Sequence, residues 1–162
     1  MSKAALSIYM DDHYAMLSGE LELVHRVKKE NPKGELEKFL VDYEHELQSQ
    51  RNLLEALLAS QGHSPSMAKQ ALTWVAEKIG RLKPNDGGSS YTDLARLLEL
   101  EILLATAQAR LLMWRTLNRV FTDRDADMEK LKQARKASDE LVKSLKPLHR
   151  EAEQRAFPKT DS

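Results

Sequence analysis

The chain has 162 residues, no cysteine, and 25 basic against 25 acidic side chains, so its formal net charge is zero. The absence of cysteine excludes thiol catalysis, zinc–cysteine sites and iron–sulfur clusters. The balanced charge gives no overall field that would attract nucleic acid. Ala, Leu, Glu, Lys and Arg make up 83 of the residues, whereas Val and Ile together number nine. This composition predicts long helices and no substantial sheet.

The sequence also lacks the signals of a membrane or secreted protein. No run of 18 or more apolar residues is present, and residues 1–6 carry one lysine without a sustained apolar stretch. We therefore expect a cytoplasmic protein with neither a membrane span nor a signal peptide. The length predicts a single domain over residues 1–162. Its partner is expected to be another protein or a second copy of itself, not nucleic acid or membrane.

Turn-forming residues divide the chain into five predicted helices. Pro, Gly and small polar residues cluster at four places where helices end, and Gly62 suits the position just after a helix C-terminus. The four breaks are Asn31–Gly34, Gly62–Pro65, Lys83–Ser90 and Thr122–Asp125. The predicted helices are 4–30, 35–61, 65–82, 91–121 and 124–157.

The long helices carry apolar residues at helical spacing. In helix 4–30 the stripe consists of Leu6, Met10, His13, Leu17, Leu21 and Val24. In helix 35–61 it consists of Leu36, Leu40, Tyr43, Leu47, Gln50, Leu54 and Leu57. In helix 124–157 it consists of Leu131, Ala134, Ser138, Leu141, Leu145, Leu148 and Ala152. Helix 91–121 is apolar nearly all round. Such a helix is either central or buried again in a second interface.

The connection lengths predict how the helices are joined. Short loops at 31–34 and 122–125 favour two antiparallel hairpins, and residues 62–90 are long enough to cross the length of a bundle. One long crossover between two hairpins is the ferritin-like connection. It would make helices 35–61 and 91–121 parallel, with helix 65–82 packed on the bundle through Leu72, Val75 and Ile79. The competing arrangement is an up-down-up-down bundle with a fifth helix laid on it.

Three stretches carry a resemblance to a known superfamily. Ser18–Arg26, Thr73–Lys78 and Leu97–Glu101 look like those of small bacterial ferritin-like proteins, and the order of long and short helices is similar over most of the chain. The resemblance implies an all-α, ferritin-like four-helix bundle with an extra helix in the crossover. It also implies a place for a di-iron centre, made of a Glu from two helices and Glu-x-x-His from the other two.

Pairing the helices by residue number brings four candidate metal ligands to one middle layer. Glu20 falls at the level of His45, and Glu46 next to it is the better inward candidate. Parallel helices 35–61 and 91–121 would put Glu101 near the level of Glu46. His149 follows within about one helical turn, ~5.4 Å. The predicted ligand set is Glu20, Glu46, Glu101 and His149. Hard oxygen ligands with one imidazole would suit iron or manganese.

The set departs from the full di-iron pattern. Ser49 stands three residues after Glu46 where His would be needed, and Lys146 stands three residues before His149 where Glu would be needed. Lys146 would bring an ammonium to the layer, which would then be a structural polar layer instead of a metal site. The complete carboxylate-x-x-His pairs of the chain fall on faces that we expect to be solvated: Glu22 with His25, and Asp42 with His45.

Helix spacing also separates two neighbouring carboxylates. Glu101 lies on the line of Leu94, Leu97, Leu98 and Leu104, and is therefore expected to be the most buried carboxylate of its helix, with Lys146, Arg115 or His149 beside it. Glu99 shares its face with Thr92, Arg96, Thr106 and Arg110, and is expected to be exposed.

Two functions remain open from the sequence. The first is a non-enzymatic ferritin-like bundle with a degenerate di-metal site, acting through its surfaces as a stress-linked scaffold or a homo-oligomer. The alternative is a metalloprotein that binds a single iron or manganese ion in the bundle core.

Overall fold

The computed structural model describes residues 3–65, 77, 91–123 and 126–159, and their long elements are all helices. These are α1 (Lys3–Glu30), α2 (Glu35–Ser60), α4 (Asp93–Val120) and α5 (Met128–Ala156). Each of their boundaries lies within four residues of its predicted position, and no strand occurs in the described part of the chain. The predicted all-α class is confirmed. The helix predicted over 65–82 falls, apart from residues 65 and 77, outside the described residues.

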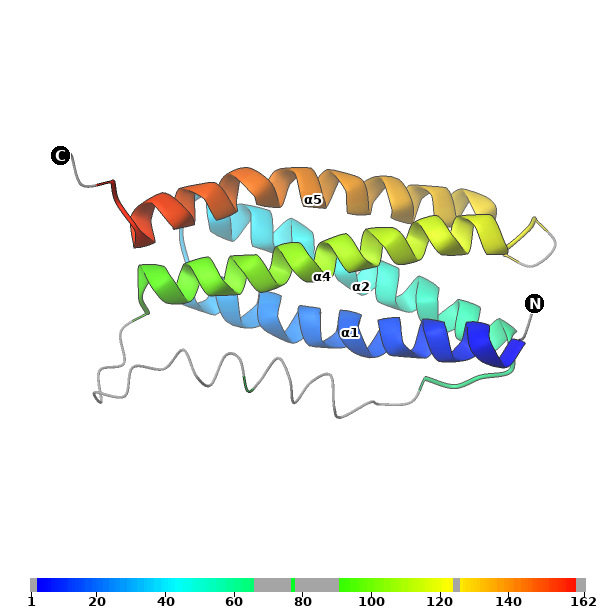
Figure 1. Ribbon diagram of the computed structural model, residues 1–162. Helices are drawn as coiled ribbons and strands as arrows, with labels where there is room; N and C mark the ends of the chain where they lie inside the picture. Colours follow the sequence, from blue (N-terminus) through cyan, green and yellow to red (C-terminus); the bar gives the residue numbers. More distant parts are fainter. Residues whose placement is uncertain (1–2, 66–76, 78–90, 124–125, 160–162) are drawn as a thin grey trace.

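The four helices form a bundle of two antiparallel hairpins (Figure 1). The hairpin partners α1 and α2 pack together, as do α4 and α5, and further contacts join α1 to α4 and α2 to α5. Figure 1 shows that α2 and α4 run in the same direction, as predicted from the length of the connection between them. Consequently α2 ends at one end of the bundle and α4 begins at the other.

Local backbone chemistry explains where the helices begin and end. Gly62 has a φ of 73°, and its N–H donates to Ala59 O at 2.9 Å while the N–H of His63 donates to Leu58 O at 3.0 Å. This is the Schellman pattern that closes a helix with a left-handed glycine. At the helix starts, the side chains of Thr92 and Asp127 accept backbone N–H groups of the first turn.

The core consists of two apolar clusters separated along the bundle. The cluster nearer residues 31–34 contains buried residues of all four helices, among them Leu23, Leu40, Leu103 and Leu145. The second cluster, at the other end of the bundle, is made by Met10, Leu54, Trp114, Leu131 and their neighbours. Between the two clusters, Glu20 of α1, Gln50 of α2 and Ser138 of α5 are polar and buried. In the described ranges, no helix is long and apolar enough to cross a membrane.

Candidate functional site

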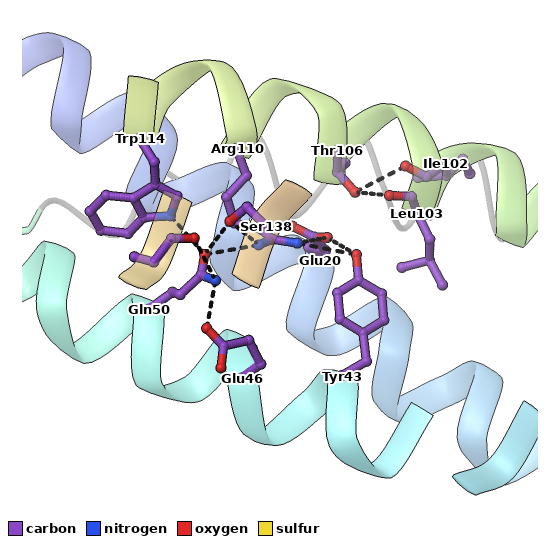
Figure 2. Close-up of polar contacts among 11 residues, drawn as sticks. Glu20, Tyr43, Glu46, Gln50, Ile102, Leu103, Thr106, Arg110, Trp114 and Ser138 are labelled. Atoms are coloured by element: carbon purple, nitrogen blue, oxygen red, sulfur yellow. Dashed lines mark hydrogen bonds and ion pairs between the residues drawn. The ribbon is translucent and has the colours of Figure 1, made fainter. Parts of the chain in front are cut away.

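Near the middle of the bundle, buried polar side chains from all four helices form one layer (Figure 2). We call this the polar layer, and each of its members is at most 2 % exposed. Its members are Glu20 of α1, Tyr43 and Gln50 of α2, Arg110 of α4 and Ser138 of α5. Glu20, Gln50 and Ser138 stand at positions adjoining or on the apolar stripes, which is why folding draws them inside.

The central contact of the polar layer is an ion pair between Arg110 and Glu20. The Nε of Arg110 lies 3.1 Å from Oε2 of Glu20, and its Nη2 lies 3.2 Å from Oε1. Two parallel N–H···O contacts make this a bidentate pair, the strongest geometry that a guanidinium and a carboxylate adopt. Tyr43 also donates its hydroxyl hydrogen to Oε1 of Glu20. Both carboxylate oxygens are therefore occupied by groups of the chain itself.

The other side of the guanidinium connects to α2 and α5. Arg110 Nη1 donates to Gln50 Oε1 at 2.8 Å and to Ser138 Oγ at 3.0 Å. Gln50 Oε1 also accepts the indole N–H of Trp114 at 2.7 Å and the hydroxyl of Ser138 at 3.0 Å. In the described residues, buried side-chain atoms without a hydrogen-bond partner are found at Arg51 and Arg96, outside the layer. The polar layer is thus fully satisfied, the condition under which buried polar groups are tolerated.

Electrostatics keep Tyr43 and Arg110 in fixed protonation states. Burial, followed by the negative charge of Glu20, raises the pKa of Tyr43 well above its usual range, so the phenol stays neutral. Burial alone would lower the pKa of Arg110, but Glu20 and Tyr43 outweigh it and the pKa is raised. The guanidinium therefore stays charged. Because neither group titrates near neutral pH, the layer contributes neither Tyr43 nor Arg110 as a proton-transfer group.

The predicted ligands do not meet in this layer as one set. Among the described residues, no group of three or more His, Asp or Glu side chains could hold a metal ion. Glu20 is in the layer and bonded to Arg110. Glu46 is half-buried at its edge, where it accepts the amide N–H of Gln50 at 2.7 Å. It lies in a groove of about 500 Å³ between α2 and α5 that reaches the layer at Gln50.

Glu101 and His149 pair with each other outside the layer. Oε1 of Glu101 lies 3.3 Å from Nε2 of His149, and the side chain of Glu101 is 49 % exposed. The prediction that Glu101 is the most buried carboxylate of its helix is therefore wrong, although His149 is beside it as expected. Lys146 is exposed, so it does not bring an ammonium to the layer.

The buried carboxylate of α4 is Glu99, which was predicted to be exposed. Glu99 is 0 % exposed, and the face it shares with Thr106 and Arg110 points into the bundle instead of toward solvent. The prediction failed because α4 is apolar nearly all round, so its leucines do not identify the inner face. The useful signal is that Glu99, Thr106 and Arg110 form one polar line on an apolar helix, opposite polar residues on the other stripes.

Glu99 belongs to a second buried group near the end of the bundle. It accepts Nε of Arg26 at 3.0 Å and the hydroxyl of Tyr91 at 2.7 Å. Asn31 joins Tyr91 to Arg96, donating to the tyrosine oxygen at 3.2 Å and accepting from Arg96 at 2.6 Å. Burial raises the pKa of Glu99 despite the opposing effects of Tyr91 and Arg26. The group ties the start of α4 to the end of α1.

Comparisons with protein-family models, with curated proteins and with solved structures give no match to this chain. The function must therefore be argued from the contacts of the polar layer and from the surfaces of the helices.

Proposed function

We propose that this chain is a non-enzymatic, ferritin-like helical bundle in which a structural polar layer stands in place of a di-metal centre, and that it acts by binding another protein or a second copy of itself. The observation that carries the proposal is the bidentate pair of Arg110 with Glu20 at the middle of the bundle. The parallel course of α2 and α4 supports the ferritin-like connection.

The chemistry of the layer favours a structural role over metal binding. A di-iron centre needs several carboxylates to balance two divalent cations. Within the polar layer Glu20 is the carboxylate, and its charge is already balanced by a guanidinium held at hydrogen-bond distance. A divalent ion at Glu20 would meet the positive charge of Arg110 and would have to break both of its contacts. The guanidinium of Arg110 would then be a buried cation without a partner, which is strongly destabilising.

A buried, fully hydrogen-bonded polar layer can fix how the helices of a bundle align. Shifting any helix by one turn would leave a charge or an amide without its partner, which costs far more than sliding leucine past leucine. Arg110 contacts residues of the other three helices, so it couples all four in one register. We infer that the layer specifies the alignment of the helices, and that the outer faces carry the activity.

The test is metal content and metal-dependent stability of protein purified without a histidine tag. The proposal expects no stoichiometric iron or manganese, and a melting temperature unchanged by either ion, because a ligand that binds only the folded state must raise it. The alternative, a single bound ion, expects one equivalent and a raised melting temperature. Loss of that ion in Glu101→Ala and His149→Ala, but not in the exposed control Lys146→Ala, would establish the alternative and overturn the proposal.

A further inference from the structure

One face of α4 remains uncovered in the described part of the structure, and it carries a coiled-coil pattern. Leu98, Ile102, Ala105, Ala109, Leu112 and Thr116 follow one another at alternating spacings of four and three residues, the a/d repeat of a helix that packs against another helix. All six side chains are half-buried or exposed, and Leu112 is 51 % exposed. We call these six residues the α4 stripe.

We propose that the α4 stripe is a homodimer interface, in which α4 packs antiparallel against α4 of a second copy across a two-fold axis near residue 107. This inference names the partner of the proposed binding function and rests on it. The size pattern and the charge pattern of the stripe are both complementary to themselves when one copy is reversed.

The size pattern is symmetric over the four inner residues of the stripe. In an antiparallel pair with the axis at 107, Ala105 of one copy faces Ala109 of the other, and Ile102 faces Leu112. Alanine against alanine lets the two backbones approach closely at the axis, while the large side chains meet on either side of it. A two-fold interface requires this kind of self-complementarity, since the same patch serves both subunits.

The charges beside the stripe select the antiparallel orientation. Glu101, Gln108 and Arg115 flank it at intervals of seven residues. They occupy the g position of the repeat, and in an antiparallel pair the g positions of the two copies lie side by side, Glu101 next to Arg115 and Gln108 next to Gln108. A parallel pair would instead place Glu101 beside the e position of the other copy, Thr106, so the attraction between Glu101 and Arg115 would be lost. Both side chains reach solvent within one copy, where Glu101 is 49 % and Arg115 54 % exposed, while Glu101 also contacts His149 and Arg115 also contacts Asp139.

The first experiment is sedimentation analysis over a range of protein concentrations. The inference expects a monomer–dimer equilibrium. Ala105→Arg places two large cations at the axis and should abolish the dimer without lowering the melting temperature of the monomer, since residue 105 is exposed in one copy. The matched control is Val41→Arg on α2, because Val41 is an exposed apolar residue that lines the groove between α1 and α2. This variant should leave the dimer intact.

The charge pairs give a second, orientation-specific test. Glu101→Arg or Arg115→Glu alone creates two like-charge contacts across the axis and should weaken dimerisation at least about tenfold. The double variant Glu101→Arg/Arg115→Glu restores both contacts with their signs exchanged, so its dissociation constant should return to near that of the original chain.

Several outcomes would overturn the inference. A chain that is monomeric at every attainable concentration would overturn the dimer. If Ala105→Arg also lowered the melting temperature of that monomer, another part of the same chain would cover the stripe. A dimer that survives Ala105→Arg would use another face. A double charge variant no better than the single variants would exclude the antiparallel register. These results leave the polar layer untouched, so the metal tests of the proposed function remain separate from them.

Discussion

Removing the guanidinium of Arg110 is the sharpest perturbation of the polar layer. Arg110→Met keeps an unbranched side chain of similar length but leaves Glu20 buried with one remaining donor, Tyr43. Gln50 and Ser138 keep each other as partners, so the uncompensated group is the carboxylate. Breaking a buried pair by removing one member costs about 3–5 kcal/mol. This is a large share of the roughly 5–15 kcal/mol that holds a domain folded.

The matched control is Arg155→Met on α5. Arg155 is 52 % exposed and lies 2.7 Å from Glu151, and an exposed pair of this kind contributes about 0–1 kcal/mol. At about 2–4 °C per kcal/mol for a chain of this size, Arg110→Met should lower the melting temperature by roughly 6–20 °C. Arg155→Met should lower it by no more than about 4 °C. Urea unfolding followed by circular dichroism measures the free energies directly.

A double-mutant cycle tests whether the loss comes from the pair. Glu20→Gln removes the charge but keeps an oxygen for the Tyr43 hydroxyl, and the double variant Glu20→Gln/Arg110→Met leaves no buried charge in the layer. We expect the double variant to be more stable than Arg110→Met alone, with a coupling free energy of about 2–3 kcal/mol. A loss in Arg110→Met no larger than that in Arg155→Met, or two single losses that simply add, would refute the role of the buried pair.

Four further predictions follow from the described contacts. Burial raises the pKa of Glu99, so ionisation of this carboxyl destabilises the folded state. The free energy of unfolding should therefore fall as pH rises above about 4.5. Urea titrations at several pH values should show that Glu99→Gln removes this fall. Burial lowers the pKa of His13, so stability should decrease as pH drops below about 6.5 and should not in His13→Gln. Gly62→Ala should cost about 1 kcal/mol because φ is 73° there; a neutral result would mean that the helix end rearranges. Glu101→Ala and His149→Ala should each cost less than about 1 kcal/mol, and a loss above 2 kcal/mol would show that this surface pair is not exposed.

Much of the architecture can be predicted from the sequence because local residue patterns mark where helices begin and end. Gly62 and the Asn31–Gly34 turn mark helix ends by backbone chemistry that needs no tertiary contact. Gln50 and Ser138 are at stripe positions, and they are buried, because the helical period alone puts them beside leucines. The long connection between α2 and α4 indicated their parallel course in the same way.

The composition of the polar layer was harder to predict because its members are chosen by partners on other helices. On α4 the leucines are spread around the helix, so hydrophobic periodicity favoured the side of Glu101 and assigned Arg110 to solvent. The actual inner face is decided by the bidentate contact with Glu20. The residue pattern of one helix contains no information about that contact with another helix. Counting polar residues at one level on all four helices would have pointed to it.

The central claim is that a guanidinium of the chain, and not a metal ion, neutralises the buried carboxylate of the layer. The most direct measurement is the NMR signal of the Arg110 Nε–H group, assigned by its disappearance in Arg110→Lys. We predict a signal protected from solvent exchange and unaffected by equimolar Mn²⁺, because the group is buried and already bonded to Glu20. Rapid exchange, or broadening of this signal by Mn²⁺ ahead of those of the exposed arginines, would contradict the claim.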